Sequence, residues 1–157
     1  MPKTPDPTRI VADADVLAAD VFLDGDARTA MDAVRAHAWL DLVVSDPLLD
    51  DAEAIIAALG DARLADDWRT IIESRCRTVD HPDGDHPGIA SAYAAGAAHL
   101  LTLDDRLTSP EAGVAIRQAM PMSARTPSAF VKVFDPGALY EATFDDDYPG
   151  PDADPRG

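Results

Sequence analysis

The chain has 157 residues, a formal net charge of −16, and 13 Lys and Arg residues against 29 Asp and Glu residues. This length suits one domain with a sizeable core, and a 46% share of apolar residues excludes a disordered acidic chain. The charge excludes the basic face of a sequence-reading nucleic-acid binder, although it does not exclude nucleic acid as a substrate.

A buried strand is predicted over residues 9–14, and helical apolar spacing follows over 15–23 and 26–39. A second strand over 40–44 leads into a helix that starts at Ser45-Asp46-Pro47, because a serine cap before a proline is typical of a first helical turn. This third helix is predicted to end at a glycine.

The second half of the chain continues the alternation of helices and strands. An amphipathic helix over 61–77 precedes a minor strand over 78–79 and a loop over 80–88, which holds two prolines and two glycines. An Ala-rich helix over 89–97 leads into a third firm strand over 99–103. The remaining predicted elements are a helix over 109–119, a strand over 122–125 and a helix over 127–133.

This alternation predicts a single three-layer α/β domain, with a mainly parallel four- to five-stranded sheet covered by helices. We predict the domain over 9–134, after a flexible N-terminus over 1–8 and before an acidic, Pro-rich tail over 135–157 that should be disordered. A single cysteine, Cys76, and the lack of an apolar signal or membrane segment predict a cytoplasmic protein with no membrane contact.

The acidic residues need a criterion other than abundance, because 25 of them are aspartates. Such an Asp-rich, Lys-poor composition resembles that of halophilic proteins, whose like charges are screened by concentrated salt. About four Asp-x-Asp pairs are expected by chance at this frequency. Position is a better guide, since ligands of a parallel sheet bind outside the carboxyl ends of its strands. Asp13 and Asp104 both follow predicted strands.

The motifs around these two acids resemble those of PIN domains, a family of small α/β metal-dependent ribonucleases. Residues 11–17, Val-Ala-Asp-Ala-Asp-Val-Leu, resemble the opening motif of the family, with Asp13 on its invariant acid. Thr102 and Asp104 match a Thr-x-Asp signature, and Asp51 best matches an acid on the third helix. Further matches that abundant aspartate cannot produce are Ser45, Gly96-Ala97, Thr126-Pro127 and Phe130.

One position departs from the family pattern. The third acid falls at His86 when it is counted back from Thr102 at the family's usual spacing, and Asp85 is its neighbour. Three interpretations remain open: Asp85 is the ligand through a shifted loop, His86 substitutes for the acid, or the site is impaired.

The resemblance implies hydrolysis of RNA phosphodiester bonds at a carboxylate site that binds Mg²⁺ or Mn²⁺. It assigns metal binding to Asp13, Asp85 and Asp104, with Asp51 facing them from the helix and Thr102 orienting Asp104 or contacting the phosphate. Hard divalent cations prefer such oxygen ligands, lower the pKa of bound water and neutralise charge on the phosphoryl group. Without metal, clustered carboxylates should have raised, coupled pKa values.

Two other functions stay open. The first is a catalytically degenerate PIN-like module, which would bind RNA or a protein without cleaving it. If the chain is instead an active, toxin-like nuclease, it would have an antitoxin partner. A homodimer is possible in either case. A phosphatase of the haloacid-dehalogenase type would also begin with a strand and Asp13-Ala14-Asp15. That chemistry needs a lysine beside the nucleophile, yet Lys3 precedes and Lys132 follows both acidic motifs.

Overall fold

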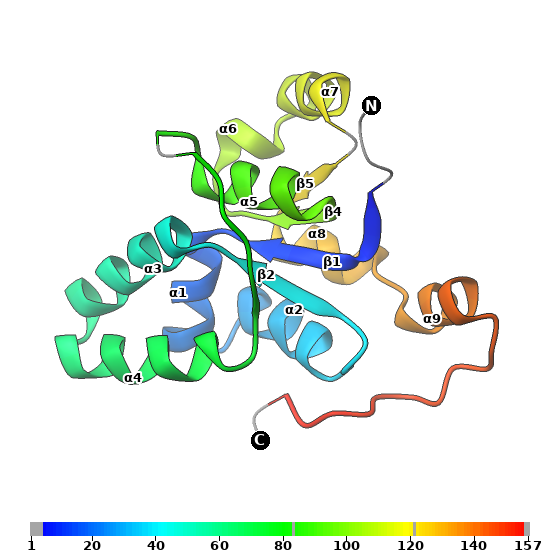
Figure 1. Cartoon of the computed structure of the whole chain (residues 1–157), viewed down its shortest axis with the longest axis horizontal. Helices are drawn as coiled ribbons and strands as arrows, with labels where there is room; N and C mark the ends of the chain where they lie inside the picture. Colours follow the sequence, from blue (N-terminus) through cyan, green and yellow to red (C-terminus); the bar gives the residue numbers. More distant parts are fainter. Residues whose placement is uncertain (1–4, 83, 121, 156–157) are drawn as a thin grey trace.

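Five parallel strands form one sheet in the order β3-β2-β1-β4-β5. The structure is a computed structural model, which describes residues 5–82, 84–120 and 122–155. It confirms the predicted three-layer α/β fold, with every strand pairing in the described part of the chain being parallel (Figure 1). The strands are β1 (Asp6–Ala12), β2 (Asp41–Val44), β3 (Arg77–Thr78), β4 (Ala97–Leu101) and β5 (Ser123–Arg125).

Helices cover both faces of this sheet, with α5 on one side and α1 and α2 on the other (Figure 1). No helix within the described ranges is long and apolar enough to cross a membrane. The helices are α1 (Ala14–Phe22), α2 (Asp26–Arg35), α3 (Asp46–Leu59), α4 (Ala62–Glu73), α5 (Pro87–Ala95), α6 (Asp105–Thr108), α7 (Pro110–Ala119), α8 (Pro127–Val133) and α9 (Pro136–Phe144).

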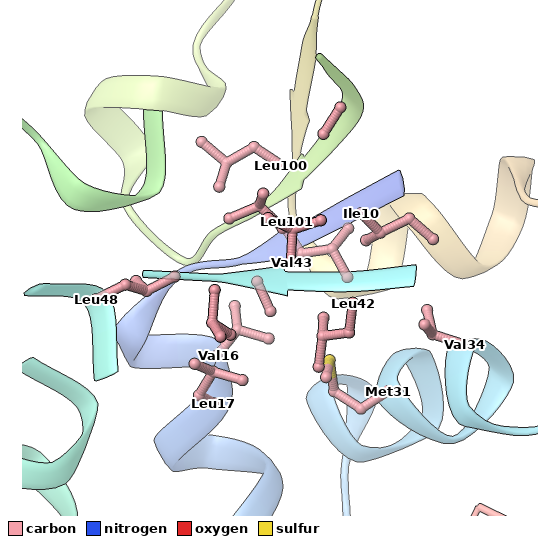
Figure 2. Close-up of a cluster of buried hydrophobic side chains, with 14 of the residues drawn as sticks. Ile10, Val16, Leu17, Met31, Val34, Leu42, Val43, Leu48, Leu100 and Leu101 are labelled. Atoms are coloured by element: carbon pink, nitrogen blue, oxygen red, sulfur yellow. The ribbon is translucent and has the colours of Figure 1, made fainter. Parts of the chain in front are cut away.

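The core lies between the central strands and the helices on either side of them. The strand residues Ile10, Val43 and Leu100 are fully or almost fully buried, and Val16 and Met31 pack against them from α1 and α2 (Figure 2). A strand buried on both faces needs a continuous apolar run rather than an alternating one. The apolar runs of the sequence therefore became the three central strands.

Local capping chemistry starts the helices where the sequence predicts. Ser45 caps α3 by accepting a hydrogen bond from the Leu48 N–H at 3.3 Å, and Thr126 caps α8 in the same way. Gly96 ends α5 in the left-handed region (φ +63°), which a glycine adopts without the steric cost of a side chain. This turn allows α5 to pass directly into β4.

The C-terminal segment differs from the predicted disordered tail over 135–157. Its first part forms α9, whose Tyr140 and Phe144 pack their rings against Trp39. Further along, Tyr148 is hydrogen-bonded to the ring of His37, and the Asp152 carboxylate accepts a hydrogen bond from the Ala38 N–H at 2.7 Å. These aromatic and polar contacts order a segment whose composition alone predicts disorder; residues 156–157 lie outside the described ones.

The N-terminal boundary also differs from the prediction of a flexible stretch over 1–8. Strand β1 already begins at Asp6, whose backbone N–H donates to the Gly96 carbonyl at 2.7 Å. Residues 1–4 lie outside the described part of the chain. The polar start of β1 is thus held by the carbonyl of Gly96, the residue that precedes β4.

Candidate functional site

The carboxyl ends of β1 and β4 lie side by side at the centre of the sheet. Connections run from β1 toward β2 and β3 on one side, and from β4 toward β5 on the other. The gap between β1 and β4 is therefore the switch point, where open α/β sheets bind ligands. Asp13 directly follows β1 and Thr102 directly follows β4.

Thr102 joins the two strand-end acids by hydrogen bonds. Its fully buried hydroxyl donates to Asp13 Oδ2 at 2.9 Å and accepts from the Asp104 N–H at 3.1 Å. The other carboxylate oxygen of Asp13 accepts from the Ala14 N–H at 3.0 Å, so that Asp13 also caps α1. Asp13 itself is buried, with 8% of its surface exposed. The threonine thus fixes the Asp13 carboxylate and the backbone that carries Asp104.

Asp15 is a third acid at this place, to which the motif resemblance assigned no metal-binding role. Its Oδ2 accepts a hydrogen bond from the Leu103 N–H at 3.2 Å, whereas its buried Oδ1 has no hydrogen-bond partner among the described residues. Burial raises the pKa of Asp15, and the charges of Asp13 and Asp104 raise it further. The charges of Asp13 and Asp104 therefore disfavour the ionised form of Asp15.

Arg106 holds the Asp104 side chain. Its guanidinium donates to both carboxylate oxygens of Asp104, at 3.0 and 2.8 Å. These hydrogen bonds lower the pKa of Asp104 to about 2. The Arg106 side chain is itself 88% exposed. An exposed ion pair of this kind is weak, so that Asp104 can exchange Arg106 for another cation.

His86, and not Asp85, lies against Asp13. His86 caps α5 by accepting a hydrogen bond from the Ile89 N–H at Nδ1 (3.3 Å), and its Nε2 lies 3.6 Å from Asp13 Oδ2. Gly88 makes this approach possible, because a Cβ at that position would lie 3.1 Å from Asp13 Oδ1. The Asp85 side chain is exposed and has no hydrogen bond or ion pair with this group of residues within the described ranges.

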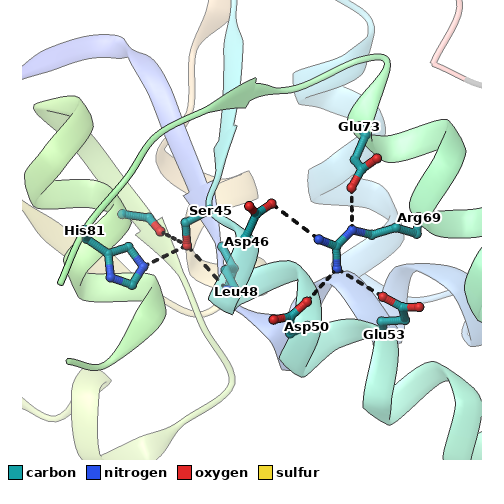
Figure 3. Close-up of polar contacts among 9 residues, drawn as sticks. Ser45, Asp46, Leu48, Asp50, Glu53, Arg69, Glu73 and His81 are labelled. Atoms are coloured by element: carbon teal, nitrogen blue, oxygen red, sulfur yellow. Dashed lines mark hydrogen bonds and ion pairs between the residues drawn. The ribbon is translucent and has the colours of Figure 1, made fainter. Parts of the chain in front are cut away.

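The predicted acid of the third helix also has no hydrogen bond or ion pair with this group of residues in the described part of the chain. Asp51 is exposed on α3 and makes no hydrogen bond or ion pair within the described residues. Its neighbour Asp50 pairs with Arg69 of α4 at 2.9 Å (Figure 3). Hydrogen bonds therefore join Asp13, Thr102 and Asp104 of the predicted site, whereas no hydrogen bond or ion pair joins Asp51 or Asp85 to them among the described residues.

The oxygen donors of these acids are of the kind that binds a hard divalent metal ion. Asp13, Asp15 and Asp104 offer the hard oxygen ligands that Mg²⁺ and Mn²⁺ prefer, and the orphaned Asp15 Oδ1 is an acceptor that needs a partner. In the described residues, however, no three His, Cys, Asp or Glu side chains are already arranged to hold a metal. The donor chemistry fits a hard cation, and Asp104 would have to leave Arg106 to complete the site.

His86 does not suit the role of a metal ligand. Since Nδ1 accepts from a backbone N–H, the proton of the neutral ring is on Nε2, the nitrogen that faces Asp13. A protonated nitrogen donates a hydrogen bond and cannot coordinate a metal. This tautomer therefore disfavours one of the three interpretations of position 86, namely that His86 replaces the third acid as a metal ligand.

A phosphatase of the haloacid-dehalogenase type would need a lysine beside its nucleophilic aspartate. Lys132 is exposed on α8. It makes no hydrogen bond or ion pair with Asp13 or Asp104 within the described part of the chain. Lys3 lies outside the described residues. The arrangement thus offers no support for that chemistry.

Replacing Asp15 by asparagine should raise the thermal midpoint of the metal-free protein by about 2 °C at neutral pH. The substitution removes a repelled charge, although it also loses a favourable charge near the N-terminus of α1, worth about 0.3–1 kcal/mol. Because the pKa of Asp15 is raised, the ionised form destabilises the fold, and the difference should shrink as the pH falls through that pKa. Calorimetry in EDTA measures it. An unchanged midpoint, or the same gain in an Asp66→Asn control on the exposed face of α4, would contradict the proposed repulsion.

A cavity of about 510 Å³ lies away from this group, beside the first half of β2. Leu42, Trp68 and Arg75 line it, and residues 153–155 of the C-terminal segment cover part of it. Burial raises the pKa of Cys76 in its wall to about 12, which keeps the thiol protonated and unreactive. The acids at the switch point therefore do not open into this cavity.

The fold and the site define an α/β domain with a parallel sheet and a group of acids at its switch point. The chain belongs to the family described as a family of unknown function, DUF7384, whose model matches residues 4–156. No curated protein and no solved structure matches the chain.

Proposed function

We propose that this chain is a cytoplasmic, metal-dependent endoribonuclease. The observation that carries the proposal is the meeting of Asp13, Thr102 and Asp104 at the switch point, with the buried, unpartnered Oδ1 of Asp15 beside them. An ionised Asp15 beside the charges of Asp13 and Asp104 is costly without a cation, and a ligand site explains why the fold keeps these acids together. The resemblance of the surrounding motifs to PIN domains supports the same chemistry.

Asp13 and Asp104 would hold Mg²⁺ or Mn²⁺. Asp15 would be the third metal ligand, the role that the motif resemblance assigns to Asp85. A bound ion of this kind activates water and neutralises charge on the phosphoryl oxygens. Thr102 holds the Asp13 carboxylate in place through its 2.9 Å hydrogen bond. His86 would donate its Nε2–H to a phosphate oxygen, since it points at the site and carries its proton there.

Mn²⁺ should raise the thermal midpoint of the protein in molar KCl. A ligand at about 100 times its dissociation constant stabilises a fold by about 2.7 kcal/mol, which corresponds to roughly 5–10 °C for a chain of this size. The Asp13→Asn variant should lose this shift, because it lacks one charge of the site, while its single amide oxygen can still accept one of the two hydrogen bonds from Thr102 and Ala14. Differential scanning fluorimetry with and without Mn²⁺ measures both.

The matched control is Asp66→Asn, which removes one exposed aspartate of α4 and should keep the whole Mn²⁺ shift. A midpoint that does not respond to Mn²⁺ would overturn the metal site. An equal response of wild type and Asp13→Asn would show that Mn²⁺ binds the acidic surface at large.

A second candidate function is a PIN-like module that binds RNA or a protein partner without cleavage. Two observations favour it: Arg106 already neutralises Asp104, and Asp85 is exposed instead of facing Asp13. Such a module would show no Mn²⁺-dependent cleavage. In an electrophoretic mobility assay it would still bind RNA, or it would form a complex with an antitoxin-like protein or a second copy of the chain.

A further inference from the structure

Three polar side chains form a chain of hydrogen bonds beside the acids, at the carboxyl end of β2. Ser91 lies in α5. Ser45 follows β2, and His81 lies in the connection between β3 and α5 (Figure 3). Ser91 Oγ lies 2.9 Å from Ser45 Oγ, which in turn lies 2.8 Å from His81 Nε2. The network thus joins a strand end, a helix and a connecting segment.

The direction of these hydrogen bonds is fixed by their ends. His81 Nδ1 lies 3.0 Å from the Pro82 carbonyl, so it carries the proton and Nε2 is the acceptor. Ser45 must then donate to His81, and its oxygen accepts from the Ser91 hydroxyl and from the Leu48 N–H. Every proton has an acceptor in one arrangement, and such a satisfied network holds its members rigidly.

Burial decides what this network can do. Ser45 and Ser91 have no exposed surface, so Ser45 cannot reach a substrate as a nucleophile despite its hydrogen bond to a histidine. A buried hydroxyl without an acceptor is costly, which makes His81 the required partner of Ser45. The network therefore has a positioning role.

The network positions the elements that face the acids. The segment that begins with His81 ends at His86, and the helix that carries Ser91 begins beside Gly88. His86 Nε2 and the Gly88 backbone both lie against the Asp13 carboxylate. One hydrogen bond from Ser45 to His81 and one from Ser91 to Ser45 thus fix His81 and the helix that carries Ser91 to the end of β2.

We infer that His81 is a positioning residue, which holds His86 at the phosphate-binding side of the acid site. This inference rests on the proposed nuclease function, because it assigns to His86 the donation of a hydrogen bond to an oxygen of the substrate phosphate. Residues that orient the groups of a metal site in this way typically change activity by about 10–100-fold when they are replaced.

The test is a double-mutant cycle on RNA cleavage with Mn²⁺ in molar KCl. His81→Phe should lower kcat/KM by about 10-fold, and His86→Ala should lower it by a similar factor. The double variant should lose no more than His86→Ala alone, because His81 acts through His86. His81→Gln should restore most of the activity, since its amide oxygen takes the place of Nε2 as the acceptor for Ser45. Additive losses, or a Gln variant as poor as the Phe variant, would overturn the positioning role.

A second measurement keeps this inference separate from the proposed function. The Ile89 amide donates to His86, so its hydrogen exchange in the metal-free protein reports whether His86 is held. His81→Phe should speed exchange at Ile89 by about 10-fold and leave Leu17, in α1, unchanged. Slow exchange in His81→Phe would overturn the positioning role. Faster exchange together with a wild type that cleaves no RNA would overturn the nuclease proposal alone.

Discussion

Replacing Asp104 by asparagine should lower Mn²⁺-dependent RNA cleavage by about 100-fold or more. The substitution removes one negative charge from the group of three acids but keeps the Oδ1 that accepts hydrogen bonds from Arg106. The loss of one group that stabilises charge in a transition state commonly costs about 100- to 1000-fold in rate. Cleavage of a fluorescently labelled single-stranded RNA in molar KCl measures the loss.

The neighbouring aspartate is the matched control for this experiment. Asp105→Asn changes an exposed residue one position further on, at the start of α6, and should keep nearly full activity. EDTA should abolish wild-type cleavage, whereas a contaminating metal-independent ribonuclease would survive it. Equal activity of the Asp104→Asn and wild-type proteins, with EDTA-sensitive cleavage in both, would contradict a catalytic role for Asp104.

The central fold could be predicted because its signals are local. The apolar run at 40–44 and the Ser45-Asp46-Pro47 start after it become β2 and α3 with nearly the predicted ends. Thr126-Pro127 likewise begins α8. The helix over 26–39 shows the limit of this reasoning, because α2 already ends at Arg35 and the chain turns so that Trp39 packs against α9. Such a turn depends on a contact with a distant segment.

The acid site could be predicted only in part, for a related reason. Strand ends identified Asp13 and Asp104, because parallel strands bring their carboxyl ends together whatever the loops do, and the motif resemblance added Thr102. The loop over 80–88 has no such constraint, so the sequence left open whether Asp85 or His86 faces Asp13. Asp15 was missed because chance supplies many Asp-x-Asp pairs. Only its buried Oδ1 distinguishes it from a solvated turn residue.

Several arginines in the described part of the chain pair with its own acids and carbonyls, which bears on how RNA could bind. Arg35 pairs with Asp20, Arg77 with Asp41 and Arg106 with Asp104. Arg9 donates to the Ala95 carbonyl at 2.7 Å. With 13 basic against 29 acidic residues, little positive charge is left to attract phosphates at low salt. The proposed nuclease would therefore depend on its metal and on molar salt for RNA contact.

Replacing Arg69 by methionine should destabilise the fold by about 2 kcal/mol at low salt. Arg69 of α4 lies within 3.3 Å of four carboxylates, those of Asp46, Asp50, Glu53 and Glu73 (Figure 3). Partial burial opposes its charge, but hydrogen bonds to Glu73 and Asp50 raise its pKa above the ordinary value. Each partly exposed pair contributes about 0.2–1 kcal/mol, and four pairs share this one guanidinium. Urea denaturation in dilute buffer measures the loss.

Salt should decide how much of that loss remains. Without Arg69, its four acidic partners on α3 and α4 would face one another with no cation between them. Molar KCl screens this repulsion, because the Debye length is only about 3 Å at that concentration. We therefore expect the cost of Arg69→Met to fall by half or more in molar KCl. Arg63→Met removes an exposed charge from the same helix and should cost less than about 0.5 kcal/mol at either salt concentration. A cost for Arg69→Met that does not change with salt would show that the arginine acts through packing of its stem. The acidic surface would then need no cation at this helix pair, even in dilute buffer.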